Sequence, residues 1–195
     1  MARQHPSVTI QLERWTDEDM PLLVRLNAPE MTEHLGGPET PEQLEKRHRR
    51  YVAAVDSDAA HIFKVVLLPE GVPVGGVNFW ERDWEGEPVL EMGWGILPEY
   101  QGRGIASAAV AQAIEQARAT SRRAAIHAFP SVDNAPSNAV CRKLGFELLG
   151  AVEFEYPKGI VGSATTACST GMGPPGGRSA CRQRPSAASL PSQLC

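Results

Sequence analysis

The fold of this chain is decided where a strand pattern gives way to a helix pattern, across Trp94-Gly95-Ile96-Leu97-Pro98-Glu99-Tyr100-Gln101-Gly102-Arg103-Gly104-Ile105-Ala106. Gly102 and Gly104 mark a turn, and an alanine-rich helix is predicted from about Gly104 to Ala119. Backbone N–H groups at the start of a helix lack partners and lie at the positive end of its dipole, so a phosphate or pyrophosphate would bind there. Small residues would let such an anion approach the main chain closely. Taken alone, however, the turn is equally typical of a plain strand-to-helix connection.

Upstream of this turn, the pattern predicts a strand, two helices and then three strands. Strict alternation of apolar and polar residues predicts the first strand at residues 8–13. Helices are expected after Thr16 and after Thr40, where Pro41 and Gln43 complete a capping box. The three strands are expected at His61 to Leu68, Val74 to Trp80 and Val89 to Ile96.

Downstream, the pattern predicts a strand, a short helix and another strand, at Ala124 to Phe129, Ala135 to Leu144 and Val152 to Tyr156. The element order is therefore βααβββαβαβ. This order predicts an α/β fold (an α+β mixed sheet) with helices packed on the sheet. Whether a final strand follows is left open.

The composition changes after Tyr156. Residues 159–195 contain neither acidic nor aromatic residues and are rich in Gly, Ser, Ala, Pro and Arg. Such a segment buries too little apolar surface to offset the entropy of ordering it. We therefore predict a domain over residues 1–158 and a disordered tail over residues 159–195, with a short strand at Ile160 to Ser169 as the alternative. Without that strand, an exposed sheet edge would invite a homodimer.

The overall composition is that of one ordinary globular domain. The chain has 195 residues, 42% of them hydrophobic, and a net charge of −4. No apolar run approaches the ~18 residues of a membrane helix, and Met1 to Pro6 lacks the apolar stretch of a secretory signal, so we expect a cytoplasmic protein without a membrane partner. The acidic balance argues against a nucleic-acid partner. The four cysteines show no C-x-x-C spacing, so neither a metal site nor a disulfide framework is predicted.

A second motif lies at Asn134-Ala135-Pro136-Ser137-Asn138-Ala139-Val140-Cys141-Arg142-Lys143-Leu144-Gly145-Phe146. Local rules describe it as a capped short helix that Gly145 ends. With the first motif, it makes residues 7–158 resemble the GNAT superfamily of acyl-CoA-dependent N-acetyltransferases, in particular the branch similar to ribosomal-protein alanine acetyltransferases. Gln101 to Ala106 match the family's [R/Q]-x-x-G-x-[G/A] turn. Asn134, Ser137 and the Lys143 to Phe146 ending match its N-x-A-S helix, with Pro136 where the family usually has Ala.

The resemblance implies acetyl-CoA as cosubstrate. Amides of Gly102 to Ala106 would hold the pyrophosphate, and main-chain groups of Ile96 and Leu97 would pair with the pantetheine arm. Asn134 would bind that arm from the other side of a splayed sheet, and an amide between Trp94 and Ile96 would polarise the thioester carbonyl. The implied cofactor-binding residues are Ile96, Leu97, Gln101, Gly102, Arg103, Gly104, Ile105, Ala106, Asn134 and Ser137.

Acetyl transfer also needs a base and an acid. Glu91 is the candidate base, because it faces the same side of its strand as two glycines and the family often has Glu there. The alternative is an ordinary strand carboxylate. Cys141 is the candidate acid, since it stands where many relatives place a Tyr. The alternative is a small buried apolar side chain, which would leave Tyr100 and Tyr156 as candidates.

These features together predict an N-acetyltransferase that moves an acetyl group from acetyl-CoA to a primary amine. A protein N-terminus, a polyamine, an antibiotic amine and an amino acid all remain open as acceptors. Acceptor contacts are expected from the loop at His34 to Gly37 and the hairpin at Trp80 to Trp84. Two alternatives are a CoA-binding domain that is catalytically impaired or senses a ligand, and a phosphate-binding module unrelated to CoA.

Overall fold

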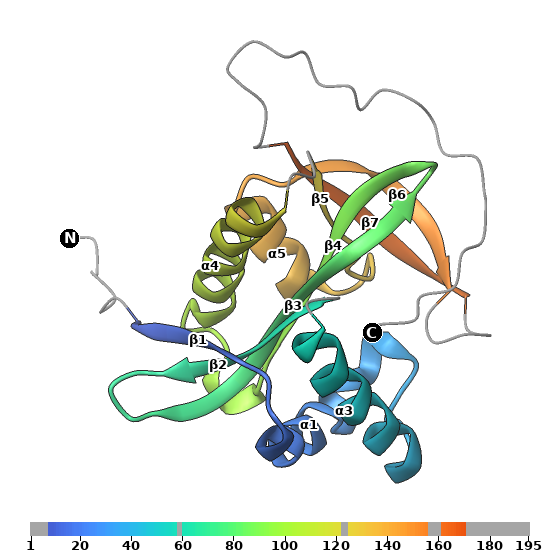
Figure 1. Cartoon of the computed structure of the whole chain (residues 1–195). Helices are drawn as coiled ribbons and strands as arrows, with labels where there is room; N and C mark the ends of the chain where they lie inside the picture. Colours follow the sequence, from blue (N-terminus) through green and yellow to red (C-terminus); the bar gives the residue numbers. More distant parts are fainter. Residues whose placement is uncertain (1–7, 58–59, 122–124, 156–160, 171–195) are drawn as a thin grey trace.

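The computed structural model describes residues 8–57, 60–121, 125–155 and 161–170, which form one sheet with helices on both faces (Figure 1). The sheet has seven strands in the order β1-β2-β3-β4-β5-β7-β6. Neighbouring strands are antiparallel except for β4 and β5, which are parallel. The strands are β1 (Ile10–Arg14), β2 (Ala60–Leu67), β3 (Val72–Trp84), β4 (Glu87–Ile96), β5 (Ala125–Ala128), β6 (Glu147–Glu155) and β7 (Val161–Thr170).

Three helices precede β2 and two follow β4 in the described chain. The described α-helices are α1 (Met20–Leu26), α2 (Pro29–Thr32), α3 (Pro41–Asp56), α4 (Ile105–Thr120) and α5 (Ala135–Lys143), and the short 3-10 turns are Asp17–Asp19, Glu33–Leu35 and Pro98–Tyr100. The predicted element order is confirmed, with the short α2 and the final strand β7 as additions. The mixed α/β fold class is confirmed with it.

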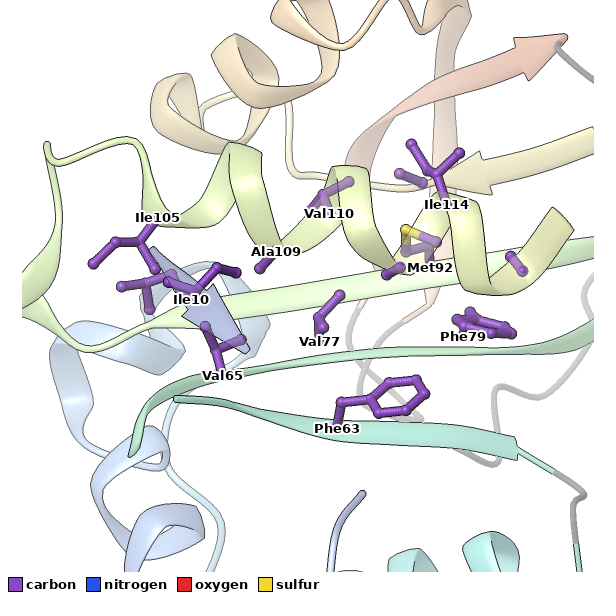
Figure 2. Close-up of a cluster of buried hydrophobic side chains, with 14 of the residues drawn as sticks. Ile10, Phe63, Val65, Val77, Phe79, Met92, Ile105, Ala109, Val110 and Ile114 are labelled. Carbon is purple, nitrogen blue, oxygen red and sulfur yellow. The ribbon is translucent and has the colours of Figure 1, made fainter. Parts of the chain in front are cut away.

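Each face of the sheet has its own hydrophobic core. Figure 2 shows α4 laid over the sheet, with Val110 and Ile114 above Val77 and Phe79 of β3. Small residues on α4, such as the fully buried Ala109, bring the helix close to the strands. Burying each large apolar side chain stabilises the fold by about 1.5–3 kcal/mol. The opposite face is covered by α1 and α3, whose core residues pack with Trp15, Ile62 and Trp80.

The predicted capping box at the start of α3 is confirmed. The Thr40 hydroxyl accepts from the Gln43 N–H at 3.3 Å, and the Gln43 side chain accepts from the Thr40 N–H at 2.8 Å. A second box joins Thr16 and Asp19 before α1. Asp19 is buried and also pairs with Lys64 of β2 at 3.0 Å, which ties this N-terminal segment to the sheet.

Strand β7 lies in the segment where the sequence predicts a tail. It pairs with β5 along one edge and with β6 along the other, so its main-chain groups have partners on both sides. Its sequence consists mainly of small residues, so its side chains give little indication of a strand. The backbone hydrogen bonds on both edges account for the strand instead. The alternative of a strand at 160–169 is thus the one found. The described sheet ends at β1 and β6, so no edge is left at β5 to invite a dimer, and residues 171–195 lie outside the described ranges.

Two further searches cover only the described residues. None of the described helices is both long enough and apolar enough to cross a membrane. In the same ranges, no group of three His, Cys, Asp or Glu side chains is placed to hold a metal ion.

Candidate active site

The sheet splays between β4 and β5. The two strands pair at only two positions in the described structure, Leu90 with Ile126 and Glu91 with His127, although β4 continues to Ile96. Residues 92–96 of β4, here called the splayed edge, therefore run beyond the ladder with β5. Main-chain polar groups need partners, so this edge offers hydrogen bonds to a ligand or to water.

The α4 turn, residues 101–106, follows directly from the splayed edge. Gly102 and Gly104 both have left-handed backbones, with φ of 71° and 81°, and Gly104 is the N-cap of α4. The Ala108 N–H makes the first intrahelical bond, to Gly104, so the N–H groups of Ile105, Ala106 and Ser107 are left over. No side chain caps this helix, whereas Thr40 caps α3 and Asn134 caps α5.

Space is also open above the turn. A Cβ added at either Gly102 or Gly104 would meet no atom within 4 Å. Free N–H groups, a helix dipole and this open space together fit a phosphate or pyrophosphate group. The predicted helix start at about Gly104 is therefore confirmed, and the turn has the local geometry of an anion site.

Gln101 fastens the turn to the end of β4. Its side-chain amide donates to the Ile96 carbonyl at 2.8 Å. The Leu97 N–H donates to Val74 of β3, and the Leu97 carbonyl accepts from the Tyr100 N–H, each at 2.9 Å. Successive N–H groups of a strand point to opposite edges. Because the Leu97 N–H points toward β3, the Ile96 N–H points outward from the splayed edge. The main chain of Leu97 therefore has partners within the protein, whereas the Ile96 N–H points away from β3.

The other residues of the turn contribute different groups. Arg103 is exposed, with its guanidinium 5.8 Å from the ring centroid of Tyr100, and adds a cation beside the turn. The side chain of Ile105 is buried in the α4 core, so only its N–H can face a ligand. Ala106 is half-buried and likewise offers its main chain.

Asn134 follows β5 and is the N-cap of α5. Its side-chain oxygen accepts from the Ser137 N–H at 3.0 Å, which caps α5. The oxygen of Asn134 and the N–H of Ser137 are therefore used within the protein, and the Asn134 amide NH₂ is the group left to donate to a ligand. Asn138 supports this loop, because its side chain donates to Ser131 and Asn134, each at 2.8 Å.

Cys141 points into the hydrophobic core beneath α4. The residue is 4% exposed, and burial raises the pKa of its thiol to about 11. A thiol of raised pKa gives up its proton less readily than an ordinary one, whose pKa is about 8.5. This burial counts against Cys141 as an acid. Tyr100 is half-buried beside the α4 turn, and Tyr156 lies outside the described residues.

Glu91 lies on the face of β4 that points away from α4. It is 4% exposed and forms an ion pair with Arg82 of β3, whose side chain is 13% exposed. The same face carries Gly93 and Gly95, as the sequence predicts. Above Gly95 lie Leu26 and Met31 of α1 and α2, since a Cβ at Gly95 would come within 3.6 and 3.3 Å of their side chains.

Three more residues join Glu91 and Arg82 in what we call the Glu91 cluster. The sequence indicated Trp84 as part of the acceptor hairpin but gave no role to His127 or Phe129. The cluster consists of Arg82, Trp84, Glu91, His127 and Phe129. The guanidinium of Arg82 lies 5.8 Å from the Trp84 ring and 5.1 Å from the Phe129 ring. The sequence does show alternate residues that would share one face of a strand, Arg82 with Trp84 and His127 with Phe129. The register that brings the two strands together, however, cannot be predicted from either segment.

His127 is the buried imidazole of this cluster. It is 3% exposed, and burial, followed by the charge of Arg82, lowers its pKa from 6.5 to about 4. The ring is therefore neutral near pH 7. Its Nδ1 atom is buried and has no hydrogen-bond partner among the described residues.

The loop at His34 to Gly37 contributes to a separate pocket of about 240 Å³ between α2 and α3. Gly36 and Gly37 line it together with Asn27 and Arg47, whereas His34 is exposed and is not part of the lining. The hairpin predicted to contact an acceptor has Arg82 and Trp84 in the Glu91 cluster. Of the two predicted acceptor regions, the hairpin is therefore the one that meets Glu91.

Known proteins of one acetyltransferase family are similar to this chain. The family model described as acetyltransferase (GNAT) domain matches residues 9–147. Among curated proteins, the chain is similar to the uncharacterized N-acetyltransferase YnaD of Bacillus subtilis (strain 168), at 30% identity over 115 residues. That alignment covers 59% of this chain and 66% of YnaD, just under two thirds of its length.

Solved structures share the fold. A GNAT-family acetyltransferase from Bacillus anthracis superposes with a TM-score of 0.69 at 21% identity, covering 83% of this chain and 94% of its own. Aminoglycoside acetyltransferase AAC(6')-Ib, solved with coenzyme A, gives 0.64 at 22% identity, covering 84% and 95%. RimL, a ribosomal L7/L12 α-N-protein acetyltransferase solved with coenzyme A, gives 0.69 at 17% identity, also covering 84% and 95%.

Proposed function

The chain belongs to the acetyltransferase (GNAT) family of acyltransferase enzymes, and on that premise we propose that it moves an acetyl group from acetyl-CoA to a primary amine. The acceptor is a protein N-terminus or a small-molecule amine. One observation carries the proposal: the α4 helix begins without a side-chain cap, beneath open space, at the end of a strand that parts from its neighbour. We place the reaction in the cytoplasm, where acetyl-CoA is the cosubstrate.

In this proposal, the donor site combines main-chain N–H groups with two side chains, on two sides of the splayed sheet. N–H groups of the α4 turn bind the pyrophosphate, and Arg103 adds a positive charge beside it. The Ile96 N–H and the Asn134 amide NH₂ hold the pantetheine arm from opposite sides. The coenzyme supplies an acetyl group activated as a thioester.

Acetyl transfer requires a neutral amine. An alkyl ammonium has a pKa near ~10, so it must lose a proton before its nitrogen can attack. Glu91 accepts that proton on the face of β4 that Leu26 and Met31 cover. The nitrogen then forms a bond to the carbonyl carbon while the carbon–sulfur bond breaks, and the sulfur leaves as a thiolate. A main-chain N–H between Trp94 and Ile96 stabilises the oxyanion.

The thiolate needs one proton to complete the reaction. Cys141 is a poor donor, because burial holds the pKa of its thiol at about 11. The acylated nitrogen, in turn, still has one proton to lose. We therefore assign the transfer of that proton from the nitrogen to the departing thiolate to solvent, which completes both products.

A CoA-binding domain with impaired catalysis is the second candidate function. The observation that favours it is the ion pair between Glu91 and Arg82, which occupies the candidate base. Binding of acetyl-CoA without turnover would support this alternative.

The test combines two independent measurements. Calorimetry gives the Kd for acetyl-CoA, and thiol release gives turnover on a panel with a peptide N-terminus, a polyamine, an aminoglycoside and amino acids. We expect Glu91→Gln to lower kcat by about 10²–10³-fold while the Kd stays within twofold, because base catalysis contributes on this order. The matched control is Glu87→Gln, an exposed carboxylate on the same strand, which should leave both values unchanged. Absence of acetyl-CoA binding would contradict the proposal outright.

A further inference from the structure

The carboxylate of Glu91 occupies a place where a lone charge is unfavourable. Burial of an unpaired carboxylate favours its neutral, protonated form, which cannot accept a proton from an amine. At 4% exposure, Glu91 has little contact with water to stabilise its charge. A base at this position needs a partner that keeps it ionised.

Arg82 supplies that partner from the neighbouring strand. Its side chain lies diagonally across the β3–β4 ladder from Glu91, since Trp80 is opposite Glu91 and Arg82 is two residues farther along β3. The guanidinium is held in place by the ring faces of Trp84 and Phe129 while it pairs with the carboxylate. The two rings are packed together, with centroids 4.7 Å apart, so the guanidinium lies against both of them. A planar cation held in this way has few other orientations, so it also fixes where the carboxylate points.

The residues in register with Glu91 on the two neighbouring strands carry no positive charge near pH 7. On β5, the residue in register is His127, which is neutral near pH 7. On β3, the residue directly opposite is the uncharged Trp80. Helix α4 packs on the other face of β4, against Leu90, Met92 and Ile96. Among these described neighbours, Arg82 is the cation that faces Glu91.

We propose that Arg82 is a positioning residue for the acetyl transfer, which keeps the buried Glu91 ionised and aims its carboxylate at the acceptor amine. This inference rests on the proposed function, because it assumes that Glu91 is the base. It predicts that removing the cation changes the pH at which the enzyme becomes active. A merely structural role for Arg82 would lower activity by the same factor at every pH.

The experiment is the pH profile of kcat/KM for the best amine of the panel. In Arg82→Gln and Arg82→Met, Glu91 loses its opposite charge and stays protonated to higher pH. We expect the acidic limb of the profile to move upward by about one pH unit or more, as for a carboxylate that loses a cation at this range. In Arg82→Lys the charge remains, so the limb should stay within about half a unit while kcat falls several-fold, because lysine lacks the planar fork. In the Glu91→Gln background, Arg82→Gln should change kcat/KM by less than twofold.

The outcomes separate the two levels of inference. A wild-type enzyme that acetylates no amine contradicts the proposed function, and the role of Arg82 falls with it. An active wild type with an unshifted acidic limb in Arg82→Gln or Arg82→Met overturns the role of Arg82 alone. If both of these variants fail to fold, Arg82→Lys decides: a wild-type kcat in that variant would overturn the aiming role.

Discussion

The α4 turn and the Glu91 cluster are built on opposite principles. The turn consists of six consecutive residues, of which 101–104 are exposed, and it offers main-chain N–H groups. The cluster is buried at Glu91 and His127 and half-buried elsewhere. It brings side chains together from β3, β4, β5 and the residue after β5, so that Arg82 and Phe129, far apart in the sequence, are in contact. A main-chain site depends only on local backbone geometry, whereas a side-chain site depends on strand register. The difference explains why the turn could be predicted from local sequence, whereas the contacts that join Arg82, His127 and Phe129 to Glu91 could not.

The comparison also separates two kinds of stability cost. At the turn, the unpaired N–H groups face open space and water, so they cost little in the free protein. In the cluster, an ion pair and a neutral imidazole are withdrawn from water, and the charge of the imidazole depends on pH. Replacement of the buried imidazole should therefore change how the free energy of unfolding depends on pH, whereas substitutions in the turn should mainly weaken ligand binding.

The largest effect is expected from His127, on folding. The pKa of His127 is about 4 in the folded chain, whereas an exposed histidine, as in the unfolded chain, has a pKa of 6.5. Between pH 4 and pH 6.5, the unfolded chain therefore binds a proton that the folded chain does not. The stability contributed by neutral His127 is complete above pH 6.5 and is lost as pH falls toward 4. The total is about 3 kcal/mol. His127→Phe should remove this part of the slope when unfolding free energies from urea titrations are compared between pH 7 and pH 4.5.

The control for that measurement is His34→Gln, which changes an exposed loop histidine. It should keep the wild-type slope. Equal slopes in His127→Phe and the wild type would mean that His127 is not held neutral, and the contrast between a buried, pH-sensitive cluster and a solvated turn would fail.

An intermediate effect is expected at the turn, from Gly104→Ala. A Cβ at Gly104 would enter the open space where an anion approaches, and the left-handed φ of 81° adds strain. Gly86 in the β3–β4 hairpin is a matched control, since its φ is 83° and a Cβ there also meets nothing within 4 Å. Both variants should lose about 1 kcal/mol of unfolding free energy. Only Gly104→Ala should raise the calorimetric Kd for acetyl-CoA, by about tenfold.

A similar rise of the Kd in both glycine variants would contradict this prediction. It would show that the loss comes from general destabilisation rather than from the α4 turn.

Much of the scaffold could be read from the sequence because its signals are local. The capping box of Thr40 and Gln43, the start of α4 at Gly104 and the facing of Glu91 each depend on a few neighbouring residues. The ion pair of Glu91 with Arg82 depends on a register in which Trp80, not Arg82, is directly opposite. Strand β7 was ambiguous for a related reason, because ladder bonds on both edges leave no trace in its composition.

The smallest effect is expected from Cys141, a single buried side chain of α5. Its thiol packs in the α4 core with a pKa of about 11, so its removal should act on packing rather than on the reaction. Cys141→Ala should cost about 1 kcal/mol of unfolding free energy, because it leaves a small cavity, and should leave kcat within about twofold. If the thiol instead protonates the leaving sulfur, kcat would fall at least tenfold and the alkaline limb of the pH profile would move. A single series of urea titrations and pH profiles on Cys141→Ala and Cys141→Ser distinguishes the two, since serine leaves a buried hydroxyl that destabilises the core without restoring an acid of thiol strength.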